Sequence, residues 1–88
     1  MHETFLFKKI LQYLEKEEKA ASRAIKRIHV TLSEFGGLSK EHFLEHFRES
    51  DRGHRWDGVR IEFKKIPYGP EFEITKIEFS VKKLRGQP

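Results

Sequence analysis

The sequence contains no cysteine among its 88 residues. It therefore cannot form a disulfide, a thiolate zinc site or an iron–sulfur cluster, and it has no cysteine nucleophile. A chain of this length buries only roughly 60–65% of the surface that its unfolded state exposes, so packed apolar side chains must stabilise it. We expect residues 1–88 to form a single domain.

The same composition bears on the cellular compartment. A chain without disulfides is typical of a cytoplasmic protein. No apolar run approaches the ~20 residues that a membrane span needs, and no signal-peptide pattern is present. We therefore expect a cytoplasmic protein without membrane contacts.

The chain is basic, with 18 Lys and Arg residues against 14 acidic residues and a net charge of +4. Because the acidic residues are interspersed among the basic ones, we favour a well-solvated surface over a nucleic-acid site. The alternative function is a basic module that binds protein or nucleic acid. One candidate basic region consists of Lys8, Lys9, Lys16, Lys19, Arg23, Lys26 and Arg27.

Two segments have the spacing of amphipathic helices. Thr4 is a suitable N-cap for the first and Ser39 for the second. The apolar stripe of the first segment consists of Phe7, Ile10, Leu11 and Leu14. The apolar face of the second consists of Phe43, Leu44 and Phe47. The spacing predicts helices over residues 4–20 and 40–49.

Three segments alternate apolar and polar residues, as half-buried strands do. The apolar residues of the first two are Ile28, Val30 and Leu32, then Val59, Ile61 and Phe63. The third runs from Phe72 to Val81. The connection Pro67-Tyr68-Gly69-Pro70 is short, so we expect the second and third strands to pair as an antiparallel hairpin.

The third strand breaks the two-residue period. Phe72 and Ile74 fall on one parity, whereas Ile77, Phe79 and Val81 fall on the other. A bulge near Thr75–Lys76 would bring both sets onto the face that the helices cover. Without a bulge, Phe72 and Ile74 would mark a surface for self-association or a partner, so a homo-oligomer is one possible state.

These elements define an α+β fold. Their order is helix–strand–helix–strand–strand, and two amphipathic helices can cover one face of a three-stranded mixed sheet. We expect the core to combine the alternating strand residues with Phe7, Ile10, Leu11, Leu14, Phe43 and Phe47.

The amino-terminal residues Met1, His2 and Glu3 form a candidate metal site. The amine of Met1, the backbone nitrogen of His2 and its imidazole can close adjacent chelate rings around one ion. Nitrogen donors in a plane suit Ni(II) or Cu(II), and the Glu3 carboxylate could complete or orient the ligand shell. The alternative is an incidental histidine at a frayed terminus.

A second histidine pattern lies in the predicted second helix. His42, Glu45 and His46 match H-x-x-E-H, the inverted zinc-peptidase motif. A peptidase also needs a third ligand and a cleft, for which so small a chain has little room, so we expect no enzyme. The histidines are either incidental on a solvent-facing helix, or one of them contributes a ligand to the terminal metal.

Three further residues are noted without an assigned function. His29 alternates with apolar strand residues and should lie on the less buried face. His54 lies in a polar loop. Trp56 either packs at the edge of the core or anchors a partner.

Several landmarks occur in a fixed order along nearly the whole chain. They are Met1-His2-Glu3 before an amphipathic helix, Ile28 to Ser39 with Gly36-Gly37, then Phe43, Phe47 and Arg48, Val59 to Pro67, and Glu73 to Phe79. In this order and spacing the sequence resembles the nickel-binding domain of HypA-type metallochaperones of hydrogenase and urease maturation. The resemblance favours the metal site over the incidental histidine.

The sequence also departs from that family. HypA-type proteins carry a zinc module with two Cys-x-x-Cys pairs between the last two strands, where this chain has Pro67 to Pro70. The resemblance therefore implies Ni(II) as the bound metal, with no structural zinc. It implies delivery of nickel rather than catalysis, with a maturation GTPase and a hydrogenase precursor as partners.

Overall fold

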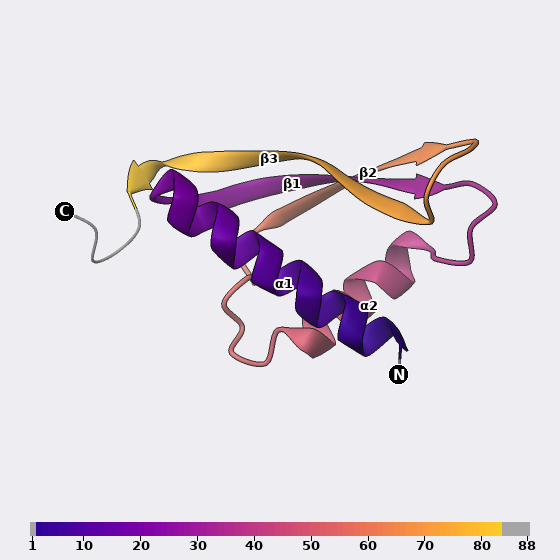
Figure 1. The fold of residues 1–88 in the computed structure, drawn as a ribbon, viewed down its shortest axis with the longest axis horizontal. Helices are drawn as coiled ribbons and strands as arrows, with labels where there is room; N and C mark the ends of the chain where they lie inside the picture. Colours follow the sequence, from indigo (N-terminus) through magenta and orange to yellow (C-terminus); the bar gives the residue numbers. More distant parts are fainter. Residues whose placement is uncertain (1, 84–88) are drawn as a thin grey trace.

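The computed structural model describes the backbone of residues 2–83 and the side chains of residues 5–81. The elements follow one another as α1 (His2–Ala21), β1 (Arg23–Ser33), α2 (Lys40–Ser50), β2 (Arg60–Ile66) and β3 (Phe72–Lys83) (Figure 1). Their order confirms the predicted one. The hydroxyl of Ser39 accepts the backbone N–H of His42 at 3.1 Å, so Ser39 is the N-cap of α2 as expected.

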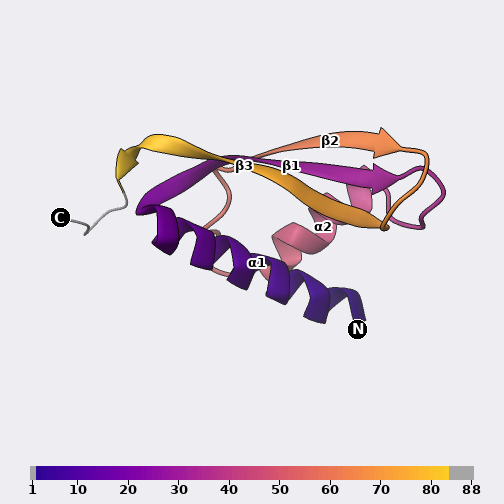
Figure 2. The same ribbon diagram turned by 45° about the horizontal axis from the view of Figure 1, so that its top comes forward.

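Both helices lie on the same face of a three-stranded mixed sheet, as Figure 2 shows. The predicted α+β fold class is therefore confirmed. Apolar residues of both helices meet the sheet in one core cluster, whose buried members are Phe7, Ile10, Leu14, Ile25, Ile28, Val30, Leu32, Leu38, Phe43, Phe47 and Trp56. Phe43 lies at the centre, with the rings of Phe7, Phe63 and Phe72 edge-on at centroid distances of 5.0–5.6 Å.

The predicted hairpin is wrong, because the strand order is β2-β1-β3. β1 pairs in parallel with β2 and antiparallel with β3, so that Ile28 faces Ile61 on one side and Ile77 on the other. The helix α2 provides the crossover that parallel pairing requires. The idea that a tight hairpin turn replaces an excised module fails with this pairing.

The connection between β2 and β3 passes over the end of β1. Its five residues can reach roughly 17 Å, which exceeds the roughly 10 Å between strands on either side of a central one. The end of β1 is tied to both neighbours, because the Ser33 N–H donates to the Glu71 carbonyl at 3.1 Å and the Glu34 N–H donates to the Ile66 carbonyl at 2.7 Å. The most buried strand thereby takes the central position.

Of the two alternatives for the parity break in β3, the bulge is the one observed. His29 faces Lys76, whereas the next residue, Val30, faces Ile74, so Thr75 is the extra residue on β3. Phe72, Ile74, Ile77 and Phe79 all pack against the core as a result. Val81 was also expected in the core, but it is 87% exposed. The pairing is irregular here, because the two-residue step from Ile25 to Arg23 on β1 spans four residues of β3, from Phe79 to Lys83.

A bulge in β1 also changes which of its side chains point toward the helices. Ile25 faces Phe79 and Arg27 faces Glu78, so Lys26 is an extra residue on β1. Ile25 and Ile28 are three residues apart, yet both are buried. This bulge extends the inward row of β1 by one residue beyond the predicted Ile28, Val30 and Leu32.

Candidate functional site

Of the three proposed metal ligands, His2 and Glu3 belong to α1. Met1 and the side chains of His2 and Glu3 lie outside the described residues, so the structure does not place the predicted ligand atoms. The first N–H groups of any helix have no intrahelical acceptor. A metal that bound the backbone nitrogens of this turn would therefore break no helical hydrogen bond.

The H-x-x-E-H residues of α2 do not converge. His42 and Glu45 are exposed, whereas His46 is half-buried against α1, with its ring centroid 5.6 Å from that of Phe7. The Nδ1 atom of His46 lies 3.5 Å from a carboxylate oxygen of Glu49. Among the side chains of residues 5–81, no three His, Asp or Glu residues form a group that could hold a metal ion. The motif thus lacks a third ligand in the part of the chain that the structure describes.

The loop after α2 is organised by one buried carboxylate. Asp51 ends α2, and its two oxygens accept the backbone N–H groups of Arg55 at 3.0 Å and Trp56 at 2.8 Å. These hydrogen bonds turn the chain back toward the core and place Trp56 in it with only 5% of its surface exposed. Of the two roles considered for Trp56, core packing is therefore the one observed.

A second buried carboxylate fixes the other side of this loop. Glu18 of α1 accepts a hydrogen bond from Arg55 at 2.8 Å, and Glu15 accepts another from the same guanidinium at 2.7 Å. The guanidinium also lies 4.8 Å from the centre of the Trp56 ring. Burial lowers the pKa of Arg55, but the hydrogen bonds to Glu18 and Glu15 outweigh it and raise the pKa overall. The loop is therefore held between α1 and α2.

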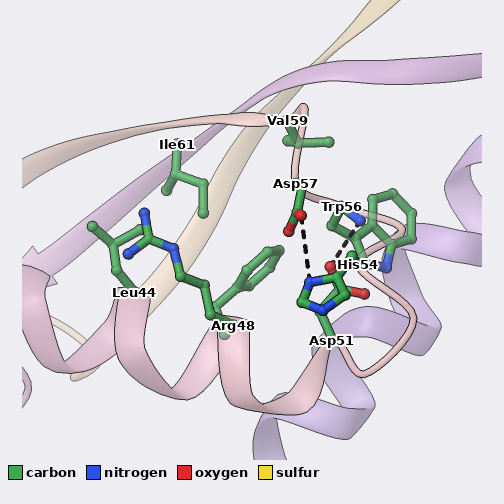
Figure 3. Close-up of a pocket in the computed structure, with 9 residues that line it drawn as sticks. Leu44, Arg48, Asp51, His54, Trp56, Asp57, Val59 and Ile61 are labelled. Carbon is green, nitrogen blue, oxygen red and sulfur yellow. Dashed lines mark hydrogen bonds and ion pairs between the residues drawn. The ribbon is translucent and has the colours of Figure 1, made fainter.

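A pocket of about 610 Å³ opens between α2, this loop and the start of β2 (Figure 3). Its apolar wall consists of Leu44, Phe47, Trp56, Val59 and Ile61. Its polar groups are Arg48, Asp51, His54 and Asp57. A volume of this size lies within the range of small-molecule sites in proteins. Sequence reasoning missed the pocket, because its walls come from segments up to 17 residues apart that only the fold brings together.

The charged groups of the pocket differ in how they are paired. The Nδ1 atom of His54 lies 3.4 Å from a carboxylate oxygen of Asp57, and each oxygen of Asp51 accepts one backbone N–H group. Arg48 extends from α2 toward Leu44 and Ile61, on the far side of the pocket from the His54–Asp57 pair (Figure 3). Within residues 5–81, no carboxylate forms an ion pair with Arg48. The pocket therefore presents one unpaired cationic group beside an apolar wall.

The opposite face of the sheet carries a small charged cluster. His29 on β1 lies on this less buried face, as expected, with Nε2 2.5 Å from a carboxylate oxygen of Glu78. Arg27 also reaches this oxygen, at 3.3 Å. The hydrogen bond from His29 is the main cause of a lowered pKa at Glu78, and the charge of Arg27 adds to it. The cluster crosslinks β1 and β3 on the face that the helices leave open.

Comparison with known proteins does not assign the chain to a family. No protein-family model matches the sequence, and no curated protein is significantly similar to it. Among the described residues, neither helix is both long and apolar enough to cross a membrane.

Proposed function

We propose that this chain binds Ni(II) at its amino terminus and hands it to a partner by ligand exchange. The observation that supports the proposal is that the backbone of His2 and Glu3 is helical, as part of α1. The Met1 amine, the His2 imidazole and backbone nitrogens of the first turn would then lie within one short stretch of chain. Amine, amide and imidazole nitrogens are donors that Ni(II) prefers.

The position of the site on the fold supports this function. Phe7 follows His2 by five residues, or about 7.5 Å of helix rise. The imidazole of His46 lies against Phe7, which makes His46 a candidate for an additional ligand from α2. The carboxylate of Glu49 beside Nδ1 can orient this ring, as carboxylates do for many metal-binding histidines.

The order of elements and the sequence landmarks resemble HypA-type metallochaperones, and this resemblance extends the proposal to hydrogenase maturation. The partners would be a maturation GTPase and a hydrogenase precursor. The chain would deliver nickel without structural zinc and without catalysing a reaction.

A nickel titration of the untagged protein tests the metal site. We expect one Ni(II) per chain near neutral pH and loss of binding below about pH 6, where the imidazole protonates. His2→Ala should abolish nickel binding, and His46→Gln should weaken it. The control is His42→Ala, which should have no effect on binding because His42 is exposed one turn away from His46. Intact-mass spectrometry must show that Met1 carries the free amine. Unchanged affinity in His2→Ala, or after addition of an N-terminal glycine, would refute the site.

One observation favours the alternative, a basic module that binds nucleic acid or an acidic protein. Lysines are exposed on α1 at Lys8, Lys9, Lys16 and Lys19, whereas Glu15 and Glu18 of the same helix are paired with Arg55. Tyr13 is exposed on the same helix, and the Lys9 ammonium lies 4.9 Å from the centre of the exposed Phe5 ring. Basic and aromatic groups on one helix are typical of such surfaces.

Binding of a labelled single-stranded oligonucleotide at several salt concentrations tests this alternative. Steep weakening with salt in the wild type, and a shallower slope in Lys8→Gln/Lys16→Gln, would support it. The matched control is Lys64→Gln/Lys65→Gln on β2, which removes the same charge from another part of the surface. Equal loss in both double variants would contradict a specific role of α1.

A further inference from the structure

The described residues that line the pocket beside Trp56 include none of the proposed nickel ligands, and its volume lies within the range of small-molecule sites. Leu44, Val59 and Ile61 are half-buried, so they keep part of their apolar surface available in the pocket. Phe47 and Trp56 form its base and are nearly fully buried. An apolar ligand group that covers the three half-buried side chains would remove them from water.

The polar side chains of the pocket indicate which charged group a ligand would carry. Asp51 accepts two backbone N–H groups, and the carboxylate of Asp57 lies beside the His54 imidazole. Arg48 has no carboxylate partner among the described side chains and extends past Leu44 toward Ile61 (Figure 3). A guanidinium presents a planar fork of donors that fits a carboxylate in a bidentate manner. The apolar wall next to it disfavours a fully hydrated anion such as phosphate.

The backbone of the loop supports a binding role. His54 adopts a left-handed conformation with φ of 55°, which is unfavourable for a residue other than glycine. Backbone strain of this kind is concentrated at binding and catalytic sites. Here it places the His54–Asp57 pair at the end of the pocket opposite Arg48 (Figure 3).

We propose that this pocket binds an amphipathic monocarboxylate, with the carboxylate on Arg48 and an aryl or branched alkyl group against Leu44, Val59 and Ile61. The inference does not depend on the proposed metal function. The ligand is a small apolar acid, and the pocket distinguishes it from its neutral analogue through the guanidinium of Arg48.

Trp56 is the only tryptophan in the sequence, so its fluorescence reports directly on this pocket. The probe is 4-phenylbutyrate, titrated in the presence of EDTA so that no metal contributes. The neutral comparison is 4-phenylbutan-1-ol. We expect a saturable change in Trp56 emission with the acid, and binding of the alcohol that is weaker by about 10-fold or more, because a charge-assisted hydrogen-bonded pair is lost.

Two variants test whether Arg48 binds the carboxylate of the probe. Arg48→Gln should weaken binding of the acid by about 10-fold and leave binding of the alcohol unchanged. The matched control is Arg60→Gln, because Arg60 is an exposed arginine on β2 that does not line the pocket. Amide chemical shifts of residues 44–61 should move on titration in the wild type. Leu44→Phe, which fills part of the pocket, should weaken both probes.

No saturable change up to millimolar acid would overturn the proposal, as would equal affinity for acid and alcohol in the wild type. The acid–alcohol comparison needs no variant, so it decides the question even if Arg48→Gln does not fold. Shift changes confined to α1 would show that the probe binds elsewhere and would equally contradict the site.

Discussion

The carboxylate of Glu18 accepts the backbone N–H of Ile25 at 2.8 Å, which joins the end of α1 to the first half of β1. Its other oxygen accepts the Arg55 hydrogen bond from the loop after α2. Glu18 is 5% exposed. One buried side chain thus connects α1, β1 and the loop after α2, and a buried acceptor of this kind is costly to remove.

Replacement of Glu18 should therefore destabilise the domain strongly. We expect Glu18→Ala to lower the free energy of unfolding by about 2–3 kcal/mol, because the Ile25 N–H loses its acceptor and Arg55 loses a partner. Glu18→Gln keeps one oxygen acceptor and should cost about 1 kcal/mol. Urea unfolding measures both. The control is Glu17→Ala, one residue away on the same helix, and an equal loss in this variant would contradict the role of Glu18.

The connection between α1 and β1 contains an unfavourable backbone conformation that glycine would relieve. Ser22 follows α1 with φ of 56°, and its N–H donates to the Lys19 carbonyl at 3.3 Å. Glycine is the preferred residue in this conformation after a helix. We expect Ser22→Gly to raise the free energy of unfolding by about 0.5–1 kcal/mol. Ser22→Ala should give no such gain, and a larger gain with alanine would show that backbone strain is not the cause.

Deletion of the extra residue in β3 tests the bulge. Without Thr75, Ile74 and Ile77 would be two positions apart, so a regular strand would still direct both toward the helices. We expect this variant to fold with a modest loss of melting temperature. Deletion of Glu73 makes Phe72 and Ile74 adjacent, which turns one of them away from the core, and should lower the melting temperature much more. Circular dichroism during heating compares the two deletions, and an equal loss in both would argue against the bulge.

The His29–Glu78 pair predicts a specific dependence of stability on pH. The hydrogen bond from His29 lowers the folded-state pKa of Glu78 below its ordinary value of 4.5. The stability that this carboxylate adds is therefore present above pH 4.5 and is lost as the pH falls through the lower folded-state pKa. Glu78→Gln should be less stable than the wild type at neutral pH, and the difference should close on acidification below 4.5.

The control for this effect is Glu73→Gln, which removes a carboxylate from the same strand without a hydrogen bond from His29. Urea unfolding at a series of pH values compares the three proteins. A difference between wild type and Glu78→Gln that does not shrink as the pH falls further below 4.5 would show that the ionised Glu78 carboxylate is not its source.

Local sequence patterns determine the elements of this fold, but not which strands are neighbours. The helical stripe from Phe7 to Leu14 and the parity break around Thr75 were sufficient to predict α1 and the bulge. The short connection at Pro67–Pro70 suggested a hairpin, yet the five residues also suffice to cross the end of β1. The deciding factor is burial of β1 between two neighbours, which depends on all three strands together. The bulge at Lys26 was missed because Ile25 and Ile28 differ in parity.

The two candidate sites also differ in whether the sequence alone could reveal them. The donors of the proposed nickel site are adjacent in sequence, so their chemistry could be recognised without a structure, and their binding stays a prediction. The pocket beside Trp56 could not be recognised, because it depends on Asp51 reversing the chain and on Arg55 reaching Glu18 37 residues earlier. Its sequence signature is only a polar loop that contains one tryptophan.

The central position of β1 has a consequence for synthesis of the protein. β1 is made early, but one neighbour follows α2 and the other is the last element of the domain. Leu32, for example, pairs with Phe72. A nascent chain that ends before β3 therefore exposes one edge of β1 and the apolar side chains on its inward face. Chaperones bind surfaces of this kind, which are otherwise prone to aggregate. The sheet can close only after residues 72–83 have left the ribosome, so the domain should fold in a single late step rather than element by element.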